Sequence, residues 1–322
     1  MNYISVNNDI VDCFALVKFA EVKSSKNGSY YMDLVFSDND GEIPAKLWNY
    51  DADRYSFIKV GEIVKIRGTV EIYNEKEQFK ILQIREICDD DEDKFSLDEV
   101  VPSAPYKGED MYNYLMGLVD GFKDEDLKTI VKSIYEDNKD KLIYFPAAKS
   151  MHHAIRGGLL LHTSSIVKMC QAVCAVYPFI NRELLISGAI LHDIAKITEY
   201  DTATTGIVSD FSKEGELIGH LVKGAMLIDE TAEKTGVDKD KAMLLEHMLL
   251  SHHGTPEYGA AVRPKFIEAE ILSQLDLLDA RIYTISDATK DVNLGEFTKK
   301  VFGLDNRRFY KENDNEYNVD LL

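Results

Sequence analysis

The chain has 322 residues, of which 45% are hydrophobic and 29% are charged. This length and composition exclude a fibrous or disordered chain and predict two domains. With 37 basic and 56 acidic residues the net charge is -19, which argues against a protein that coats duplex nucleic acid by bulk electrostatics. No stretch approaches the roughly 20 uncharged apolar residues of a membrane span, and the first residues lack a signal pattern, so we expect a cytoplasmic protein without membrane contact.

The first part of the chain, residues 1–88, is rich in strand-forming residues separated by short turn signals. Between the third and fourth strands, the segment 51–58 places Tyr55, Phe57 and Ile58 on one helical face, where an OB-fold has its helix. The expected strands are residues 13–22, 29–37, 42–49, 62–73 and 78–86. This order predicts an all-β OB-fold barrel, although other small barrels share such strands.

Alternation along the second and third strands separates an inner from an outer face. Tyr31, Lys46 and Trp48 fall on the outer face, which OB-folds commonly use to bind single strands. An aromatic platform beside a cation suits stacked bases and phosphates. The alternative is that Tyr31 and Trp48 lie half-buried against the second domain. The side chains expected inside are Tyr30, Met32, Leu34, Phe36, Ile43, Ala45 and Leu47.

An acidic, proline-bearing passage, residues 89–108, is typical of a linker between domains. From residue 109 onward the apolar spacing becomes helical, so residues 109–308 are predicted to form an all-α domain. The acidic tail, residues 309–322, fits either a frayed end or a contact in a homo-oligomer.

All eight histidines lie in the helical region, between His152 and His253. Imidazole and carboxylate are ligands of first-row transition metals, and the helices of a bundle can each supply one or two of them to its core. A lone histidine on a helix is usually a packed or surface residue, but an ordered series is harder to explain in that way. The candidates are His162, His192-Asp193, His220, His252-His253 and Asp276.

Other polar residues of this region have a less definite role. Lys196 follows Asp193 by three residues, so it lies on the same helical face and could neutralise the oxygens of a bound phosphate; the alternative is a solvated lysine. Asp279, one turn after Asp276, is expected to support a ligand or to pack against another helix. Of the remaining histidines, His152 and His153 could contact phosphate or merely pack, and His247 is expected in the core or on the surface.

The series His162, His192-Asp193 and Asp276 resembles the signature of HD-domain phosphohydrolases, whose helical core binds divalent metal and cleaves phosphate esters. His220 and His252-His253 resemble the larger ligand set of binuclear HD proteins. Three longer stretches closely resemble the YhaM family of bacterial 3′-to-5′ exoribonucleases, which also has an N-terminal OB-fold. These stretches are Phe145-Pro146-Ala147-Ala148-Lys149, Gly157-Gly158-Leu159-Leu160-Leu161-His162-Thr163 and Leu250-Ser251-His252-His253-Gly254.

The resemblance implies a multi-domain hydrolase, an OB-fold followed by an all-α HD domain, that digests single-stranded RNA from its 3′ end to nucleoside 5′-monophosphates. Single-stranded DNA is the alternative substrate. Asp193 would bridge two divalent ions and orient the attacking water, and Lys196 would assist catalysis. A histidine-rich site suits manganese, iron or zinc better than magnesium, and we favour manganese. The implied ligands are His162, His192, Asp193 and Asp276 for the first ion, completed by His220, His252 and His253 for the second.

Three other functions share parts of this pattern. An HD-type cyclic-dinucleotide phosphodiesterase would use the same ligands, but no Gly-Tyr-Pro sequence follows the HD region. A nucleotide phosphohydrolase would not need an OB-fold. A non-catalytic single-strand or DNA-binding factor would not need an intact ligand series. The sequence therefore favours the exoribonuclease.

Overall fold

The computed structural model of the protein describes residues 10–25, 27–38, 41–74, 76–149, 153–290, 292–315 and 317–321. Its contacts divide the chain into two compact units. The barrel unit consists of Met1–Ala104 and Asp201–Asp210, and the helical unit consists of Pro105–Tyr200 and Phe211–Leu322. His152, a candidate phosphate contact, lies outside the described residues.

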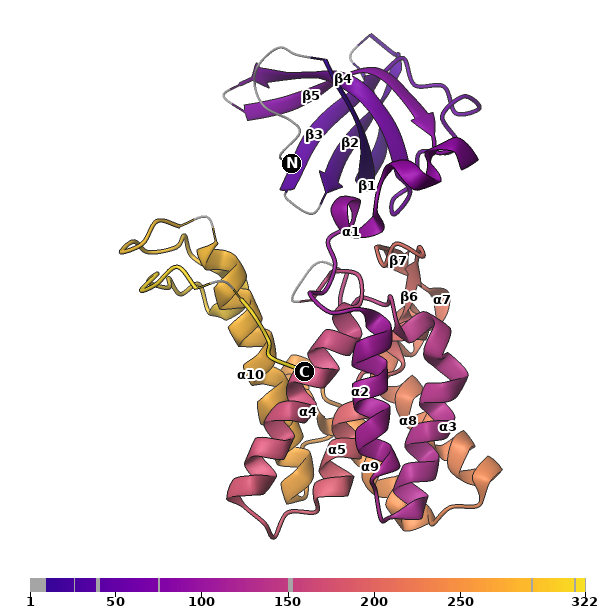
Figure 1. The fold of residues 1–322 in the computed structure, drawn as a ribbon, viewed down its shortest axis with the longest axis vertical. Coiled ribbons are helices and arrows are strands. Elements are labelled where there is room, and N and C mark those ends of the chain that lie inside the picture. The colour runs from indigo at the N-terminus through magenta and orange to yellow at the C-terminus, as the bar shows by residue number, and fades with distance from the viewer. Residues whose placement is uncertain are drawn as a thin grey trace. The chain divides into compact units, whose positions relative to one another are not determined.

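Five strands form a closed barrel in the order β1-β2-β3-β5-β4 (Figure 1). The pairs are antiparallel except for β3 with β5, and β4 pairs with β1 to close the barrel. This is the OB-fold that the sequence predicts, and each strand begins and ends within two residues of its expected position. The strands are β1 (Val11–Ser24), β2 (Tyr30–Asp38), β3 (Gly41–Trp48), β4 (Ile63–Tyr73) and β5 (Lys76–Glu86).

The core of the barrel follows the predicted alternation. Met32, Leu34 and Phe36 of β2 are 4%, 2% and 0% exposed, and the inward residues of β3 are buried as well. Tyr30, which was expected inside, is 60% exposed, because it is the first residue of β2 and lies beyond the end of the core. Gly68 lies at a bulge in β4, where a Cβ atom would come within 2.1 Å of the carbonyl oxygen of Lys80. A side chain at this bend would force the two strands apart.

The helix expected over residues 51–58 does not form. The segment consists of hydrogen-bonded turns, in which Tyr55 donates its amide to Asp51 and Ile58 donates its amide to Tyr55. Oδ1 of Asp51 also accepts from two following backbone amides, those of Asp53 and Arg54, which favours a turn over a continuous helix. Tyr55, Phe57 and Ile58 nevertheless pack against the barrel core, as their spacing indicated.

The segment predicted as a linker, residues 89–108, is largely ordered. It contains the short helices η1 (Asp89–Lys94) and α1 (Leu97–Val100) before α2 begins at Gly108. Val100 and Val101 are buried against Leu16 of the barrel. The passage up to Ala104 therefore belongs to the barrel unit, because these apolar side chains cover one end of its core.

The helical unit is built of antiparallel neighbours around a buried centre (Figure 1). Asp124 and Asn181 cap the starts of α3 and α5 by accepting hydrogen bonds from backbone amides. The longer helices are α2 (Gly108–Asp120), α3 (Glu125–Leu142), α4 (Gly158–Val176), α5 (Arg182–Leu191), α8 (Gly219–Thr235), α9 (Lys239–Ser251) and α10 (Ile267–Thr289). The short ones are α6 (Lys196–Glu199), α7 (Lys213–Leu217), η2 (Pro256–Tyr258) and η3 (Phe302–Leu304).

The sequence was expected to contain no segment that resembles a membrane span, but helix α4 is such a segment by length and composition. Its 19 residues are long and apolar enough to cross a membrane by length and composition alone, with a mean hydropathy of 1.5. However, 61% of this segment is buried inside the protein. Its apolar character therefore matches the requirement of a central helix in a bundle.

Two segments depart from the predicted domain limits. The hairpin of β6 (Tyr200–Thr202) and β7 (Val208–Phe211) interrupts the helical unit, and its tip belongs to the barrel unit, where Thr205 donates to the carbonyl of Gly61. The tail after residue 308 does not fray where it is described. Tyr106 donates its hydroxyl to the carbonyl of Val319, and Leu321 is only 2% exposed. Tertiary packing thus orders both segments.

Candidate metal centre and nucleic-acid surface

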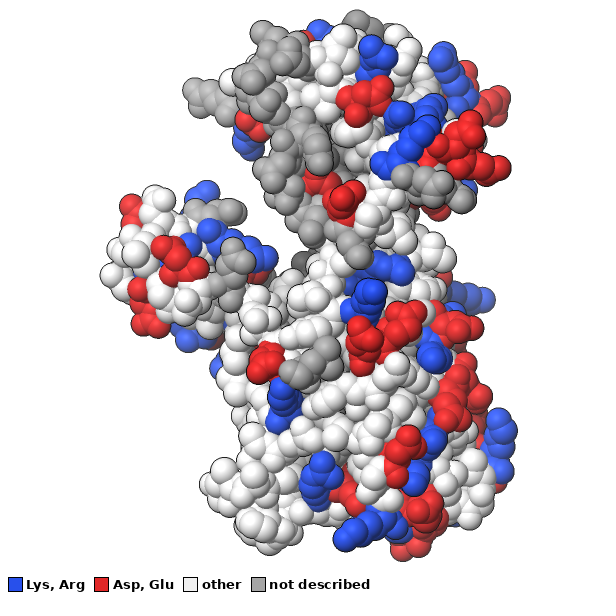
Figure 2. All heavy atoms as spheres, in the orientation of Figure 1, with Lys and Arg blue, Asp and Glu red and all other residues white. Residues whose placement is uncertain are grey.

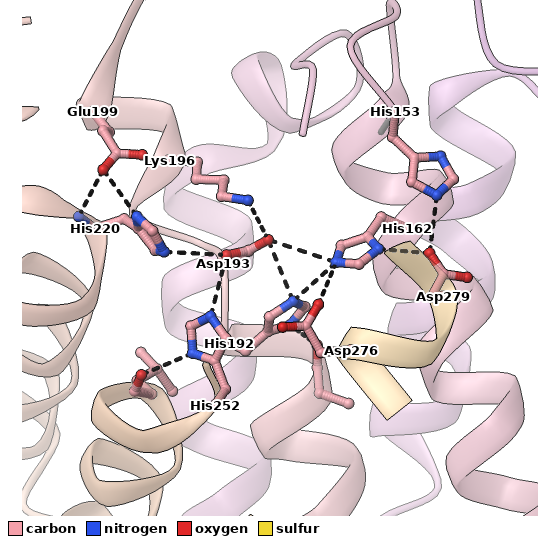
Figure 3. A network of polar contacts seen from close by, with 12 residues as sticks. His153, His162, His192, Asp193, Lys196, Glu199, His220, His252, Asp276 and Asp279 are labelled. Atoms are coloured by element: carbon pink, nitrogen blue, oxygen red, sulfur yellow. Dashed lines mark hydrogen bonds and ion pairs between the residues drawn. The ribbon is translucent and has the colours of Figure 1, made fainter. Parts of the chain in front are cut away.

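The ligand candidates that the sequence predicts meet inside the helical unit, where Figure 3 shows all of them except His253, which lies beside His220 and His252. His162, His192, Asp193 and His252 are buried, His253 is partly buried, and the side chains of His220 and Asp276 are 12% and 16% exposed. The shared position brings together residues separated by more than a hundred positions in the sequence. They come from α4 (His162), the end of α5 (His192 and Asp193), α8 (His220), the end of α9 (His252 and His253) and α10 (Asp276).

His192-Asp193 and His252-His253 are positioned in the same way, each at the C-terminal end of a helix. Helix α5 ends at Leu191 and α9 ends at Ser251, so His192 and His252 each follow the last helical residue directly. Each of these rings donates from Nδ1 to the carbonyl three residues earlier, at 2.8 Å. Because each helix ends there, the residue that follows the histidine, Asp193 or His253, is not held at helical spacing. Its side chain can therefore reach the same centre as the histidine before it.

One group of atoms surrounds Oδ2 of Asp193. This oxygen lies 3.7 Å from Nε2 of His162 and 3.3 Å from Nε2 of His192. The two ring nitrogens are 3.3 Å apart, and Asp276 Oδ1 is 3.2 Å from that of His162. When both rings are neutral and donate from Nδ1 elsewhere, their Nε2 lone pairs face each other. A positive charge between them relieves this repulsion.

A second group surrounds the other oxygen of Asp193. Oδ1 lies 3.6 Å from Nε2 of His220 and 3.6 Å from Nε2 of His252, and Nδ1 of His253 completes the group. These four buried atoms have no hydrogen-bond partner among the described residues. Each such atom costs about 1–3 kcal/mol. The donor set of imidazole nitrogen and carboxylate oxygen fits a transition metal ion, which would satisfy all four atoms at once.

The imidazole nitrogens that do not face Asp193 make hydrogen bonds that fix the orientation of the ligand rings. His162 donates from Nδ1 to Asp279 at 2.7 Å, and His153 donates to the same oxygen at 2.9 Å. Ser165 donates to the other oxygen of Asp279. Asp279 therefore supports a ligand, one of the two roles expected for it, and the buried His153 supports Asp279.

Glu199 holds the ring of His220 in the same way. Its Oε1 accepts from Nδ1 of His220 at 2.9 Å and from the backbone amide of His220 at 3.1 Å (Figure 3). Glu199 is the last residue of α6 and is 8% exposed. Burial alone would raise the pKa of its carboxyl, but the hydrogen bonds from His220 hold that pKa below its ordinary value. The carboxylate thus orients Nε2 of His220 toward Asp193.

The centre is electrostatically prepared for a cation. Burial would lower the pKa of His162, but its hydrogen bonds to Asp276 and Asp279 raise that pKa to about 10. The carboxylates of Asp276 and Asp279 therefore stabilise a positive charge at His162, which a proton or a metal ion can supply. Burial lowers the pKa of His253 to about 4, aided by the nearby His252 and His220, and so keeps this ring in the neutral form that binds metal.

Lys196 and His247 have different positions relative to this centre. The ammonium of Lys196 lies 2.7 Å from Oδ2 of Asp193, and the residue is 8% exposed. Together with His192 it holds the pKa of Asp193 well below its ordinary value, although burial opposes this shift. His247 instead accepts from the amide of Lys265 and lies against the ring of Phe266, away from the cluster.

The predicted surface of the barrel brings Tyr31, Lys46 and Trp48 together. Tyr31 pairs with Trp48 across β2 and β3, and their ring centroids are 5.0 Å apart. Trp48 is 58% exposed. The ammonium of Lys46 lies 4.8 Å from the centre of the Tyr31 ring and 2.6 Å from Asp33. The cation is thus partly neutralised, and the aromatic pair is the more accessible feature.

A groove of about 580 Å³ extends from Trp48 over β4 and β5. Leu82 is 52% exposed, and Tyr55 contributes a second aromatic ring to the wall. Figure 2 shows acidic and basic side chains intermingled on the face that it presents, so the net charge of -19 does not form one continuous acidic surface there. The basic residues that line the groove are Lys46, Arg54, Lys65, Arg67 and Arg85.

Comparison with known proteins bears on both units. The HD domain family matches residues 159–281, and an OB-fold nucleic acid binding domain matches residues 17–87. A protein from Listeria monocytogenes named 3′-5′ exoribonuclease YhaM is 35% identical over 303 residues, which make up 94% of this chain and 95% of that protein. Proteins of the same name from Geobacillus sp. and Bacillus pumilus are 34% and 32% identical over 302 residues, 94% of this chain and 91% and 94% of theirs.

The chain belongs to the YhaM family of 3′-5′ exoribonucleases. It is therefore a hydrolase that combines an OB-fold with a metal-dependent HD domain, and the predicted fold class is confirmed.

Some residues of this YhaM-family site carried no clear signal in the sequence. Glu199 is one of many acidic residues, and only the fold brings it to His220. Ser165 lies one turn after His162, a spacing that could have indicated a contact near the ligand. Of the basic side chains of the groove, Lys46 was predicted, whereas Arg54, Lys65 and Arg67 were missed because they come from a turn and from another strand.

Proposed function

We propose that the chain is a metal-dependent 3′-5′ exoribonuclease that holds two divalent ions and releases nucleoside 5′-monophosphates from single-stranded RNA. The observation that carries this proposal is the position of Asp193, whose two carboxylate oxygens face two separate groups of imidazole nitrogens. A carboxylate in this position is suited to bridge two ions. The family membership supports the choice of substrate and direction.

The ligands divide between the two oxygens of Asp193. His162, His192 and Asp276 would hold one ion with Oδ2, and the other set would hold the second ion with Oδ1. Divalent ions in such a site act as Lewis acids toward phosphate and activate water. The histidine-rich set favours manganese, with iron and zinc as alternatives, over magnesium. The second set is His220, His252 and His253.

The protein's own residues orient the reaction. Asp193 would accept a hydrogen bond from the attacking water, since both its oxygens point into the centre. Lys196 would exchange its contact with Asp193 for the phosphate as negative charge builds there. Asp279 and Glu199 would keep the ligand rings in place during this step.

The barrel would bind the RNA upstream of the reacting end. Tyr31 and Trp48 offer ring faces to bases, and the basic groove offers charge to phosphates without reading the sequence. Single-stranded DNA is the alternative ligand of the same surface. A homo-oligomer is compatible with this arrangement but is not required by it.

The test is a digestion series with purified, manganese-loaded protein. Single-stranded RNA labelled at its 5′ end should shorten stepwise, and a hairpin or a phosphate at the 3′ end should slow the ladder. Release of the labelled mononucleotide at once, or rapid cutting of circular RNA, contradicts a 3′-5′ exonuclease. Cyclic dinucleotides, nucleoside triphosphates and single-stranded DNA in parallel reactions separate the other hydrolases, and binding without hydrolysis of any substrate would indicate a non-catalytic factor.

A further inference from the structure

A cavity of about 320 Å³ opens beside the metal centre in the helical unit. Its lining combines charged and ligating side chains with aliphatic, aromatic and small polar ones. This volume lies at the lower limit of small-molecule sites, so it fits one nucleoside unit rather than a longer strand. The charged and ligating residues are Asp193, Lys196, His252, His253 and Asp276, and the other lining residues are Gly254, Thr255, Tyr258, Ser273, Gln274, Leu277 and Ala280.

One wall of the cavity is a single face of α10. Ser273 lies three and four residues before Asp276 and Leu277, and Ala280 lies four and three residues after them, so the four residues form one stripe on the helix. Leu277 is 37% exposed and directly follows Asp276, a ligand candidate whose side chain is 16% exposed. The same helix therefore presents a ligand candidate and an accessible apolar surface side by side.

The opposite wall is the loop that follows His253. Its backbone is ordered by its own hydrogen bonds, including those from Tyr258 to Thr255 and from Gly259 to Pro256. Gly254 lets the loop approach α10 closely, since a Cβ atom there would lie 2.8 Å from the hydroxyl of Ser273. On this ordered loop the ring of Tyr258 is 66% exposed. The loop is thus ordered by its own hydrogen bonds and presents an accessible aromatic side chain to the cavity.

We propose that this cavity binds the 3′-terminal nucleoside of the substrate, with the base against Tyr258 and Leu277 and the phosphate at the Lys196 end. This inference rests on the proposed exonuclease function and assigns its terminal subsite. Lys196 is the only lysine or arginine among the lining residues and lies 2.7 Å from Oδ2 of Asp193, so the phosphate has its place beside the metal centre and the base lies apart from it. Contact through an aromatic ring and an aliphatic chain accepts any base, which suits an enzyme that removes successive nucleotides.

The experiment measures binding rather than hydrolysis. Metal-loaded, full-length protein is titrated calorimetrically with uridine 5′-monophosphate and, separately, with inorganic phosphate. Tyr258→Ala should weaken binding of the nucleotide by about 5- to 150-fold, the range for loss of one stacked base, and leave the affinity for phosphate as in the wild type. Tyr258→Phe should restore nucleotide binding. Tyr177→Ala, which removes a 52% exposed tyrosine outside the cavity, is the matched control and should bind both ligands normally.

Three results would overturn the subsite. These are equal nucleotide affinity in wild type and Tyr258→Ala, equal loss of nucleotide and phosphate binding in Tyr258→Ala, and wild-type protein that binds the nucleotide no more tightly than phosphate. These outcomes are independent of the RNA ladder. A protein that shortens RNA stepwise but shows any of these results retains the proposed function and lacks this subsite, whereas a protein that binds as expected but leaves RNA intact lacks the function.

Discussion

The contact between Glu199 and His220 provides a direct test of the second ion position. Glu199→Ala removes the acceptor of two hydrogen bonds, at 2.9 Å from Nδ1 and 3.1 Å from the backbone amide of His220. The ring of His220 then loses its fixed orientation, while the ligands His162 and His192 keep their own partners. Loss of such a support reduces metal affinity by roughly 10- to 100-fold, or about 1.4–2.7 kcal/mol.

The assay is equilibrium dialysis of the folded variant against graded manganese, with the bound metal counted by mass spectrometry. One ion should bind as in the wild type and the other should be weakened by the factor above. The manganese concentration required for RNA hydrolysis should rise by the same factor, with kcat restored at saturating metal. Glu199→Gln should lose less, because a carboxamide oxygen can still accept.

Glu214→Ala is the matched control, since this acid lies in the neighbouring helix α7 and pairs with Lys223 instead of a ligand. It should bind both ions normally. If Glu199→Ala also retains two ions at wild-type affinity, the support of His220 by Glu199 has no role in metal binding and the reasoning is wrong.

Four further outcomes are expected. Asp193→Ala should lose most of the bound metal and all hydrolysis, and full activity in this variant would refute the bridging role. Trp48→Ala should weaken binding of long RNA by about 1–3 kcal/mol but barely change hydrolysis of a dinucleotide; an equal loss on both would contradict a guiding role. Leu321→Ala should lower the free energy of unfolding by about 2 kcal/mol in a denaturant titration, whereas no change would mean that the tail is not part of the core. In the native protein a thiol reagent at pH 8 should label the exposed Cys88 before the partly buried Cys13, because burial, with help from Asp38 and Asp12, raises the pKa of Cys13 to about 11; rapid labelling of Cys13 would contradict this raised pKa.

The sequence alone determined the strands of the barrel and most of its faces. A side chain in a strand alternates between core and surface, so Met32, Leu34 and Phe36 could be assigned from their order. The ligand candidates could be recognised because histidines beside carboxylates, in a series along a helical chain, have few structural explanations. The outer pair Tyr31 and Trp48 followed from the same alternation.

Tertiary structure decided how the candidates are used. His252 and His253 are adjacent and could not both be placed from helical spacing, but α9 ends at Ser251, so one ring presents Nε2 and the other Nδ1 to the same centre. Glu199 and Asp279 acquire their roles only when distant helices meet, because a hydrogen bond between residues 117 positions apart leaves no periodic pattern. The tail and the hairpin tip are ordered for the same reason: their partners, such as Tyr106 and Gly61, lie far away in the chain. Local pattern thus specifies elements and chemical groups, and long-range packing specifies their partners.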